Sequence, residues 1–197
     1  MNIDEEKAKI RKEMLRRRSG ISSATLSEID KTLPDFILSI EDEELQDKLH
    51  NAKRIALYRA FKGEVPVDGL AKYFMSRGIK CCFPRIDNGS MSFYDSDDLV
   101  GFETSSLGIK EPVPQADAVD PSTVDIVVLP AVAYNEEGTR LGMGGGYYDR
   151  FIGSLGAGRP YLLGVCYGFQ ICSEVPVTDH DAEVDLIAVI PEEIYGE

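Results

Sequence analysis

The distribution of apolar residues along the chain predicts β-strands separated by helices. Three near-continuous apolar runs stand out: VDIVVLPAV (124–132), the segment RPYLLGVCYG (159–168) and VDLIAVI (184–190). Such runs are typical of strands that are covered on both faces, as in a parallel sheet. Shorter strand candidates are RIALY (54–58), IKCCFP (79–84) and MSFY (91–94), the last expected at a sheet edge.

Between these strands, apolar residues at helical spacing predict helices. Pro34 is expected to interrupt or kink one of them, because proline lacks a backbone N–H, whereas Pro66 suits the first turn of another. The segment 95–121 is rich in turn residues, and we assign it no strand. One helix is expected over 3–18, and a second begins at a cap formed by Ser22 or Ser23. Further helices are expected over 41–52, 66–78 and about 147–154.

Alternating strands and helices indicate the α/β class. We therefore predict a single three-layer α/β/α domain with a mainly parallel central sheet. With 197 residues, and with no repeat, low-complexity tract or linker, the whole chain 1–197 is expected to form that one domain.

Composition narrows the class of protein. The chain is 43% hydrophobic and 28% charged, as in an ordinary globular protein, and no apolar run approaches the ~20 residues of a membrane span. The charged N-terminus argues against a signal peptide, and four cysteines without a C-x-x-C spacing suggest free thiols. A cytoplasmic protein without a membrane partner is expected. The net charge of -13 argues against nucleic acid as a partner.

The segment RLGMGGGYYDR (140–150) carries the most unusual chemistry of the sequence. It is not a P-loop, because no Lys-Ser/Thr pair follows its glycines. It is not a Rossmann fingerprint either, because the third glycine would fall at Tyr147 or at Asp149, depending on the starting glycine.

The physics of phosphate loops nevertheless applies to this segment. Glycines let backbone N–H groups approach an anion closely, and the following helix start adds further N–H groups. Arg140 and Arg150 flank the loop, while Asp149 would repel phosphate unless a Mg2+ ion lay between them. The segment thus reads as a Mg-nucleotide loop, and the glycines alone fit equally well a turn that packs a helix against a sheet.

Taken with three further stretches, this loop resembles that of the 5-formyltetrahydrofolate cyclo-ligase family. The loop form R-L-G-x-G-x-G-Y-Y-D stands here at 140–149, after LPAVAYNEEG. KAKIR (7–11) resembles the basic N-terminal helix of the family, and YRAFKGEV (58–65) its Y-x-x-x-x-x-E segment. VPVTDHDAEVD (175–185) resembles its P-x-x-x-H-D-x-x-x-D segment. One departure is Met143, where relatives often carry tyrosine or another large polar residue.

The resemblance implies an ATP- and Mg2+-dependent enzyme. Members of the family cyclise 5-formyltetrahydrofolate to 5,10-methenyltetrahydrofolate and release ADP and phosphate. Phosphorylation of the formyl oxygen makes it a leaving group, and N10 then attacks the formyl carbon. Such a reaction depends on positioning and charge neutralisation rather than on a protein nucleophile. The expected ligands are 5-formyltetrahydrofolate, ATP and Mg2+, and we expect the chain to be a monomer.

The resemblance also implies roles for particular residues. Arg140 and Tyr148 would be catalytic, and Asp149 and Asp181 would hold Mg2+. Spacing alone also allows Lys7 and Arg11 to form an ordinary solvated helix face. One of Tyr147 and Tyr148 is expected to be buried and the other to face the site. The implied ATP-binding residues are Lys7, Arg11, Arg140, Leu141, Gly142, Met143, Gly144, Gly145, Gly146, Tyr147 and Tyr148. The implied substrate-binding residues are Arg59, Glu64, Met143, Gly144, Gly145, Gly146 and Tyr147.

Two other kinds of function remain open at the level of sequence. One is a binding protein that keeps folate or nucleotide but has lost turnover, an interpretation that rests on Met143. The other is a sugar-phosphate isomerase or acyl-CoA transferase on a similar scaffold, because fold does not determine function. Those enzymes would need a general-base or nucleophilic carboxylate in place of a paired Mg2+ site.

Overall fold

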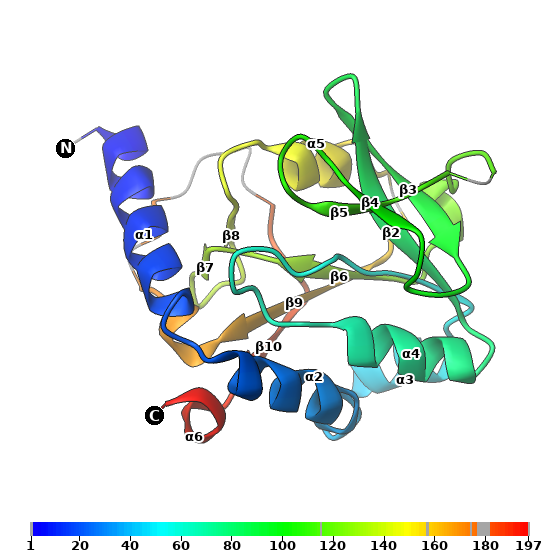
Figure 1. Ribbon diagram of the computed structural model, residues 1–197, viewed down its shortest axis with the longest axis horizontal. Coiled ribbons are helices and arrows are strands. Elements are labelled where there is room, and N and C mark those ends of the chain that lie inside the picture. The colour runs from blue at the N-terminus through cyan, green and yellow to red at the C-terminus, as the bar shows by residue number, and fades with distance from the viewer. Residues whose placement is uncertain (1, 115, 157, 174, 177–181, 197) are drawn as a thin grey trace.

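A six-stranded sheet forms the centre of the molecule (Figure 1). The computed structural model describes residues 2–114, 116–156, 158–173, 175–176 and 182–196. The strand order is β10-β9-β6-β1-β2-β3, and all neighbouring strands are parallel except β2 and β3. The α/β class with a mainly parallel sheet is therefore confirmed. The strands are β1 (Arg54–Ala56), β2 (Lys80–Asp87), β3 (Ser90–Ser96), β6 (Ile126–Pro130), β9 (Tyr161–Tyr167) and β10 (Leu186–Ile190).

The apolar runs of the sequence occupy adjacent strands of this sheet. β6 and β9 are buried at every position, and the register pairs Val128 with Leu163. β10 pairs with β9 on the other side. β3 is an antiparallel edge strand, as expected. It joins β2 through Asn88 and Gly89, whose φ angles of 49° and 81° suit a two-residue hairpin turn.

Helices cover the two faces of the sheet unequally (Figure 1). On one face α2, α3 and α4 bury the larger apolar core together with the inner side chains of the strands. On the other face α5 contributes Phe151, which contacts Phe93 of β3 edge-to-face at 5.0 Å. The helices are α1 (Ile3–Arg18), α2 (Ser23–Leu38), α3 (Glu43–Asn51), α4 (Asp68–Ser76), α5 (Tyr147–Gly153) and α6 (Glu192–Tyr195).

Pro34 does not end its helix, and α2 runs through it from its N-cap Ser22 to Leu38. A proline at this position leaves the carbonyl of Asp30 without its helical N–H donor. α4 packs against that carbonyl through Gly69, where a Cβ would come within 1.9 Å of the oxygen. The backbone N–H of Gly69 also donates to Oδ1 of Asp30 at 2.8 Å. The carbonyl that lacks a helical donor in α2 is thus the one against which α4 packs closely.

The turn-rich segment 95–121 contains a hairpin that the sequence did not predict. β4 (Phe102–Thr104) pairs antiparallel with β5 (Lys110–Pro112), and the hairpin lies beside β2. Its strands have three residues each, which is too short for a recognisable alternation of polar and apolar positions. It contributes to the candidate site described below.

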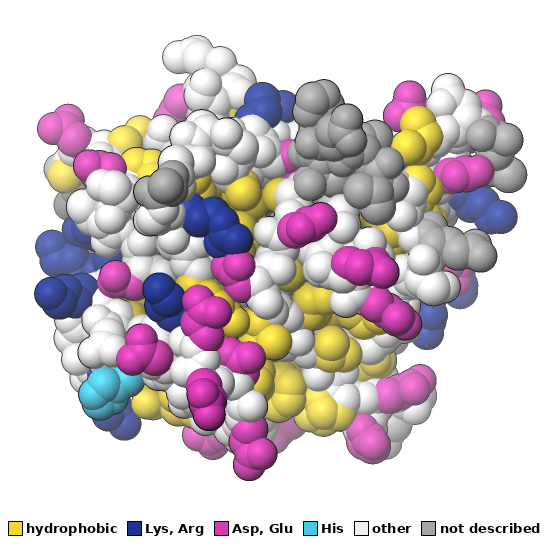
Figure 2. All heavy atoms as spheres, turned by 180° about the vertical axis from the view of Figure 1, so that it is seen from behind, with side chains coloured by type: hydrophobic (Ala, Val, Ile, Leu, Met, Phe, Trp, Pro, Cys, Tyr) yellow, Lys and Arg dark blue, Asp and Glu magenta, His cyan; other side chains and the backbone are white. Residues whose placement is uncertain are grey.

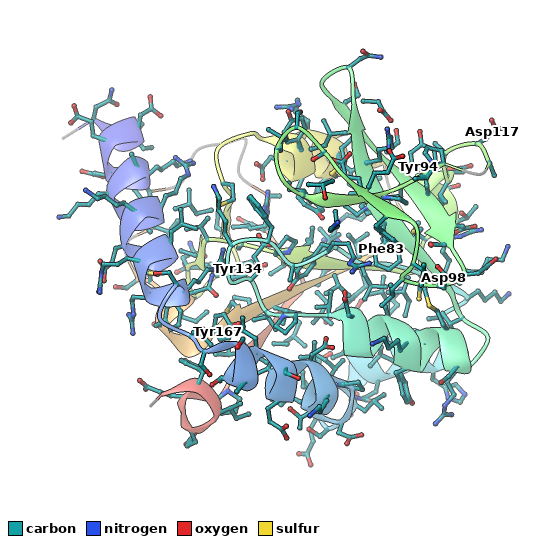
Figure 3. All side chains as sticks on the ribbon, in the orientation of Figure 1. Phe83, Tyr94, Asp98, Asp117, Tyr134 and Tyr167 are labelled. Carbon is teal, nitrogen blue, oxygen red and sulfur yellow. The ribbon has the colours of Figure 1, made fainter. Side chains whose placement is uncertain are left out.

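A second short hairpin supports helix α1. β7 (Ala133–Tyr134) pairs with β8 (Arg140–Leu141), and a small apolar cluster joins this hairpin to α1 through Met14 and Leu141. Beneath it, Tyr134 points into the interior (Figure 3), and its hydroxyl donates to the carbonyl of Leu129 at 2.9 Å. α1 is thereby held beside the strand that leads into the glycine loop.

Acidic side chains are spread over the face opposite to that of Figure 1, with an apolar area near its lower centre (Figure 2). This distribution agrees with a net charge of -13. Within the described part of the chain, no helix combines the length and the apolar character needed to cross a membrane.

Candidate functional site

Helix α1 brings basic side chains to the glycine loop. Arg11 Nε donates to the carbonyl oxygen of Gly142 at 2.9 Å, a contact between residues that are 131 positions apart. One turn earlier, Lys7 is only 8% exposed. The two residues therefore do not form a solvated helix face. They lie on the side of α1 that faces the body of the protein, as a phosphate-binding role requires.

The loop between β8 and α5 adopts a backbone that favours glycine. Gly144 and Gly146 have φ angles of 99° and 63°, in the region that L-amino acids rarely occupy. At Gly142, a Cβ would lie 3.0 Å from Nη1 of Arg140. These glycines therefore set the path of the loop and leave room for the guanidinium below it.

Arg140 is the buried cation at the base of the loop, with 4% exposure. Its Nη1 donates to the carbonyl of Pro130 at 3.1 Å, and its Nη2 donates to Oδ1 of Asp149 at 2.7 Å. Its Nε is buried and makes no hydrogen bond within the described structure. The last carbonyl of β6 and the carboxylate from α5 thus fix the guanidinium from two sides and leave one donor unpaired.

The two tyrosines at the start of α5 both line the candidate pocket, and both are partly exposed. Tyr148 also packs against the apolar cluster that contains Phe93 and Phe151, and Tyr147 is not part of that cluster, so the expected division into one buried and one open ring is found only in part. The guanidinium of Arg150 lies 5.0 Å from the ring of Tyr147, and that of Arg140 lies 5.3 Å from the ring of Tyr148. Desolvation raises the pKa of Tyr148, and its hydroxyl is therefore a neutral donor at neutral pH.

A pocket of about 370 Å³ adjoins the loop. Its volume lies within the range of small-molecule sites, roughly 300–1,000 Å³. Gly142, Met143, Gly145 and Gly146 form one wall, and Leu141 and Gly144 are not part of the lining. At Gly144 a Cβ would instead lie 3.7 Å from the guanidinium carbon of Arg11. The loop therefore separates α1 from the pocket and contacts both.

Glu64 lines the same pocket from the segment after β1. It ends a tight turn in which Lys62 and Gly63 have positive φ angles of 49° and 72°. The backbone N–H of Phe61 donates to Oε2 of Glu64 at 3.0 Å, and Nη1 of Arg18 lies 4.0 Å from Oε1. Burial raises the pKa of the Glu64 carboxyl to about 7, although Arg18, the Phe61 N–H and Arg140 act in the opposite direction.

Arg59 also lines the pocket, but its charge is already engaged. Its Nη2 donates to Oδ2 of Asp68 at 3.1 Å, and its guanidinium lies over the ring of Phe102 at 4.5 Å. In this arrangement Arg59 connects the pocket wall to α4 and to the β4–β5 hairpin.

Several residues of the lining were not predicted from the sequence. Leu107, Ile109 and Glu111 come from the β4–β5 hairpin and its turn, and Tyr58 and Phe61 flank Glu64. Leu107 is 49% exposed although it is a large apolar residue. An apolar residue between turn residues, SSLGI at 105–109, was the one signal that could have indicated this wall.

The expected Mg2+ ligands are described only in part. Asp181 and the neighbouring His180 lie outside the described residues. Among the residues that are described, no group of three or more His, Cys, Asp or Glu side chains could hold a metal. Oδ1 of Asp149 accepts the hydrogen bond from Arg140. Oδ2 accepts no hydrogen bond from any residue that the structure describes. One carboxylate oxygen beside the glycine loop fits Mg2+, which takes few protein ligands together with phosphate oxygens and water.

A second hollow of about 480 Å³ lies on the far side of the β4–β5 hairpin. Tyr94, Asp98 and Asp117 mark it in Figure 3. Its lining is acidic, and none of the four sequence motifs contributes to it.

The fold and the site together define an α/β enzyme whose glycine loop separates a basic helix from a ligand-sized pocket. The model of the 5-formyltetrahydrofolate cyclo-ligase family matches residues 3–190. The mouse 5-formyltetrahydrofolate cyclo-ligase (Mus musculus) is 24% identical over 196 residues, which cover 94% of each chain.

Solved structures agree with these sequence matches. The 5,10-methenyltetrahydrofolate synthetase from Aquifex aeolicus superimposes with a TM-score of 0.75 at 28% identity, covering 93% of this chain and 89% of that one. The corresponding enzyme from Mycoplasma pneumoniae gives a TM-score of 0.71 at 25% identity, with 92% and 97% covered. The chain belongs to the 5-formyltetrahydrofolate cyclo-ligase family.

Proposed function

We propose that this protein closes 5-formyltetrahydrofolate to 5,10-methenyltetrahydrofolate at the expense of ATP, with Mg2+ as cofactor. The observation that carries the proposal is the position of the glycine loop. One side of the loop contacts Arg11 of α1, and the other side lines the pocket that contains Glu64. Two ligands bound on opposite sides of so thin a loop would meet at its tip, as a transfer between them requires.

The side that faces α1 suits the triphosphate of ATP. Lys7, Arg11 and Arg140 supply positive charge, and the loop N–H groups from Gly142 to Tyr148 can donate hydrogen bonds to phosphate oxygens. Asp149 would hold Mg2+, and Asp181 is proposed as its second carboxylate ligand. The metal would neutralise phosphate charge and orient the phosphates.

The pocket suits the folate. The Glu64 carboxylate accepts hydrogen bonds, and the pterin ring of a folate presents N–H donors to it. Its walls are largely apolar where Leu107, Ile109 and Met91 contribute, as a flat aromatic ligand requires. Met143 and Tyr147 lie on the loop wall beside it.

In the proposed reaction the formyl oxygen attacks the γ-phosphorus and ADP leaves. N10 then attacks the formyl carbon and loses its proton to water, the C–O bond breaks and phosphate departs. Arg140 lines the pocket and neutralises negative charge on the transferred group through the fixed charge of its guanidinium, and Tyr148, which is neutral at pH 7, donates a hydrogen bond. Both residues act by fixed charge and orientation, and neither forms a covalent bond with substrate.

The test is to incubate the purified protein with 5-formyltetrahydrofolate, with and without Mg-ATP, and to follow the methenyl product by absorbance together with phosphate release. We expect product and phosphate in a one-to-one ratio, and neither without ATP. Arg140→Met should abolish turnover, while the exposed-site control Arg16→Met should not. Binding of both ligands without turnover would indicate a non-catalytic binding protein, and turnover without ATP would contradict the proposal.

A further inference from the structure

Arg18, at the last turn of α1, is buried with an incomplete set of partners. It is 2% exposed, and its Nη2 donates to the carbonyl of Ala131. Nε and Nη1 are buried and make no hydrogen bond with any described residue. A buried guanidinium with so few hydrogen bonds is costly unless a nearby negative charge offsets the desolvation. The position of the closest carboxylate is therefore informative.

That carboxylate is Glu64. Nη1 of Arg18 and Oε1 of Glu64 are 4.0 Å apart, and their side chains are 2% and 10% exposed. Oε2 is occupied by the N–H of Phe61, whereas Oε1 accepts no hydrogen bond within the described structure. Arg18 thus attracts the carboxylate electrostatically and leaves Oε1 available to another donor.

The packing of the backbone fixes this distance. Gly63 has a φ of 72°, and a Cβ at this position would lie 2.9 Å from Cβ of Arg18 and 3.0 Å from its carbonyl oxygen. The turn that carries Glu64 therefore rests directly on the end of α1. The helix end and the turn are thus in close backbone contact.

Other groups near Glu64 do not replace Arg18. Arg140 also acts on the carboxyl, but it already forms an ion pair with Asp149 at 2.7 Å. The remaining titratable groups that interact with Glu64 come from the segment after β1, from β7, from α5 and from β9. They are tyrosines with pKa values raised by burial, and hence uncharged near neutral pH: Tyr58, Tyr134, Tyr148 and Tyr167.

We propose that Arg18 is a positioning residue that keeps Glu64 ionised and oriented to accept hydrogen bonds from the folate ring. Arg18 does not line the pocket, and it therefore acts on the ligand only through Glu64. The assignment rests on the proposed function, since it takes a folate as the ligand of the pocket. It makes α1 common to both halves of the site, with Arg11 at the loop and Arg18 behind Glu64.

The test compares Arg18→Gln, which removes the charge but keeps an amide donor, with Arg18→Lys, which keeps the charge. Arg16→Gln on the exposed side of the same helix is the matched control. Dissociation constants for 5-formyltetrahydrofolate and, separately, for ATP are measured by calorimetry between pH 6.5 and pH 9. Thermal midpoints are recorded for every variant.

The expected result follows from the ionised fraction of Glu64. A pKa one unit above the present value of about 7 would reduce that fraction at pH 7 from about one half to about one tenth. Arg18→Gln should therefore bind the folate at least about fivefold more weakly at pH 7 and recover to within about twofold at pH 9. Its ATP affinity and that of Arg16→Gln should stay within about threefold of the wild-type value.

Two further results test the electrostatic mechanism. Adding Arg18→Gln to Glu64→Gln should not weaken folate binding any further, because Arg18 acts on the folate only through the charge of Glu64, which the Glu64→Gln variant already lacks. Arg18→Lys should bind the folate within about threefold of the wild-type affinity. If Arg18→Gln does not fold, the folate affinity of Arg18→Lys alone tests the proposal. A tenfold loss in Arg18→Lys at an unchanged thermal midpoint, or a loss in Arg18→Gln that persists at pH 9, would overturn the proposal. If wild type itself does not bind the folate, the proposed function fails instead.

Discussion

At the scale of single residues, the protonation of Glu64 links the pocket to the stability of the whole protein. Its carboxyl has an ordinary pKa of 4.5 and a value of about 7 in the folded protein, because burial disfavours the charge. Between these values the folded state binds more protons than the unfolded state, and stability must therefore fall as pH rises. Above the folded-state pKa of about 7, the free energy of unfolding is lowered by the full cost of ionising the buried carboxyl.

This reasoning gives a measurable pH dependence. The free energy of unfolding of wild type relative to Glu64→Gln should fall by about 3 kcal/mol between pH 4.5 and pH 8. Urea denaturation of both proteins at each pH measures this difference, and the Gln variant serves as the reference for all other titrating groups. A difference that stays constant with pH would show that folding does not raise the pKa of Glu64.

Asp149 provides a second prediction at this scale. Asp149→Ala should lower Mg-ATP-dependent turnover more than tenfold, a loss above ~1.4 kcal/mol of transition-state stabilisation. Asp149→Asn keeps a side-chain oxygen that can accept a hydrogen bond from Arg140 but removes the negative charge. Comparison with Asp149→Ala therefore separates the loss of that hydrogen bond from the loss of metal binding. Steady-state rates across a Mg2+ titration are the measurement, with Glu136→Ala on the surface as control. Full activity of Asp149→Asn would exclude a role as metal ligand.

At the scale of elements, the glycine loop is the part on whose geometry the proposed reaction depends most. Gly144 has a φ of 99°, but a Cβ there would meet nothing closer than 3.7 Å. Gly144→Val therefore introduces backbone strain although its Cβ alone meets no clash, and the loop is expected to relax into another path. Turnover should fall more than tenfold, because small displacements of reacting groups are costly, while the thermal midpoint changes little.

The control for this loop variant is Gly153→Ala in α5, where a Cβ would meet nothing within 4 Å. Thermal midpoint, ATP affinity and turnover are measured together for both variants. Normal turnover of Gly144→Val would mean that the loop only packs a helix on the sheet. Unfolding would mean that the glycine serves the scaffold.

The β4–β5 hairpin should determine folate affinity through Leu107. Leu107→Asp places a charge in an apolar wall of the pocket and should weaken 5-formyltetrahydrofolate binding by about tenfold, since an apolar contact is lost and a charge is desolvated. ATP binding should not change. Val100→Asp is the matched control, because Val100 is 79% exposed and does not line the pocket. Equal folate affinity of Leu107→Asp and wild type would place the ligand away from this wall.

The elements show how far a sequence can predict this fold and site. β6, β9 and β10 follow from apolar runs, and α1 and α5 follow from helical spacing. The β4–β5 hairpin could not be predicted, because its three-residue strands are stabilised by contacts with β2 rather than by their own pattern. Likewise, the motifs identified the glycine loop and Glu64, but no local pattern shows that Arg18 is buried beside Glu64. That pairing depends on how α1 packs in three dimensions.

At the scale of the whole molecule, close packing around β9 holds the two faces of the sheet together. A Cβ at Gly164 would lie 2.8 Å from Cζ and from Oη of Tyr134, which is fully buried. Gly164→Ala should therefore lower the free energy of unfolding by roughly 1–3 kcal/mol, a typical cost of overpacking. Chemical denaturation measures it. Because the clash involves the hydroxyl, the cost should be smaller in a Tyr134→Phe background.

We propose that the whole chain is one folding unit. If it is, the Gly164→Ala variant should unfold in a single transition that is shifted to lower denaturant. Far-ultraviolet circular dichroism and tyrosine fluorescence should then report the same midpoint. Two separated transitions would show that α1 and the sheet are independent units.

The contacts of α1 with the rest of the site also have a consequence for the order of folding. The hydrogen bond from Arg11 to Gly142 spans 131 residues, and that from Arg18 to Ala131 spans 113. Contacts between such distant positions close large loops, and they form after local structure in most chains. During synthesis α1 leaves the ribosome before the glycine loop does, and its contacts with the loop cannot form until residue 142 has been made. Activity is therefore among the last properties that this chain acquires.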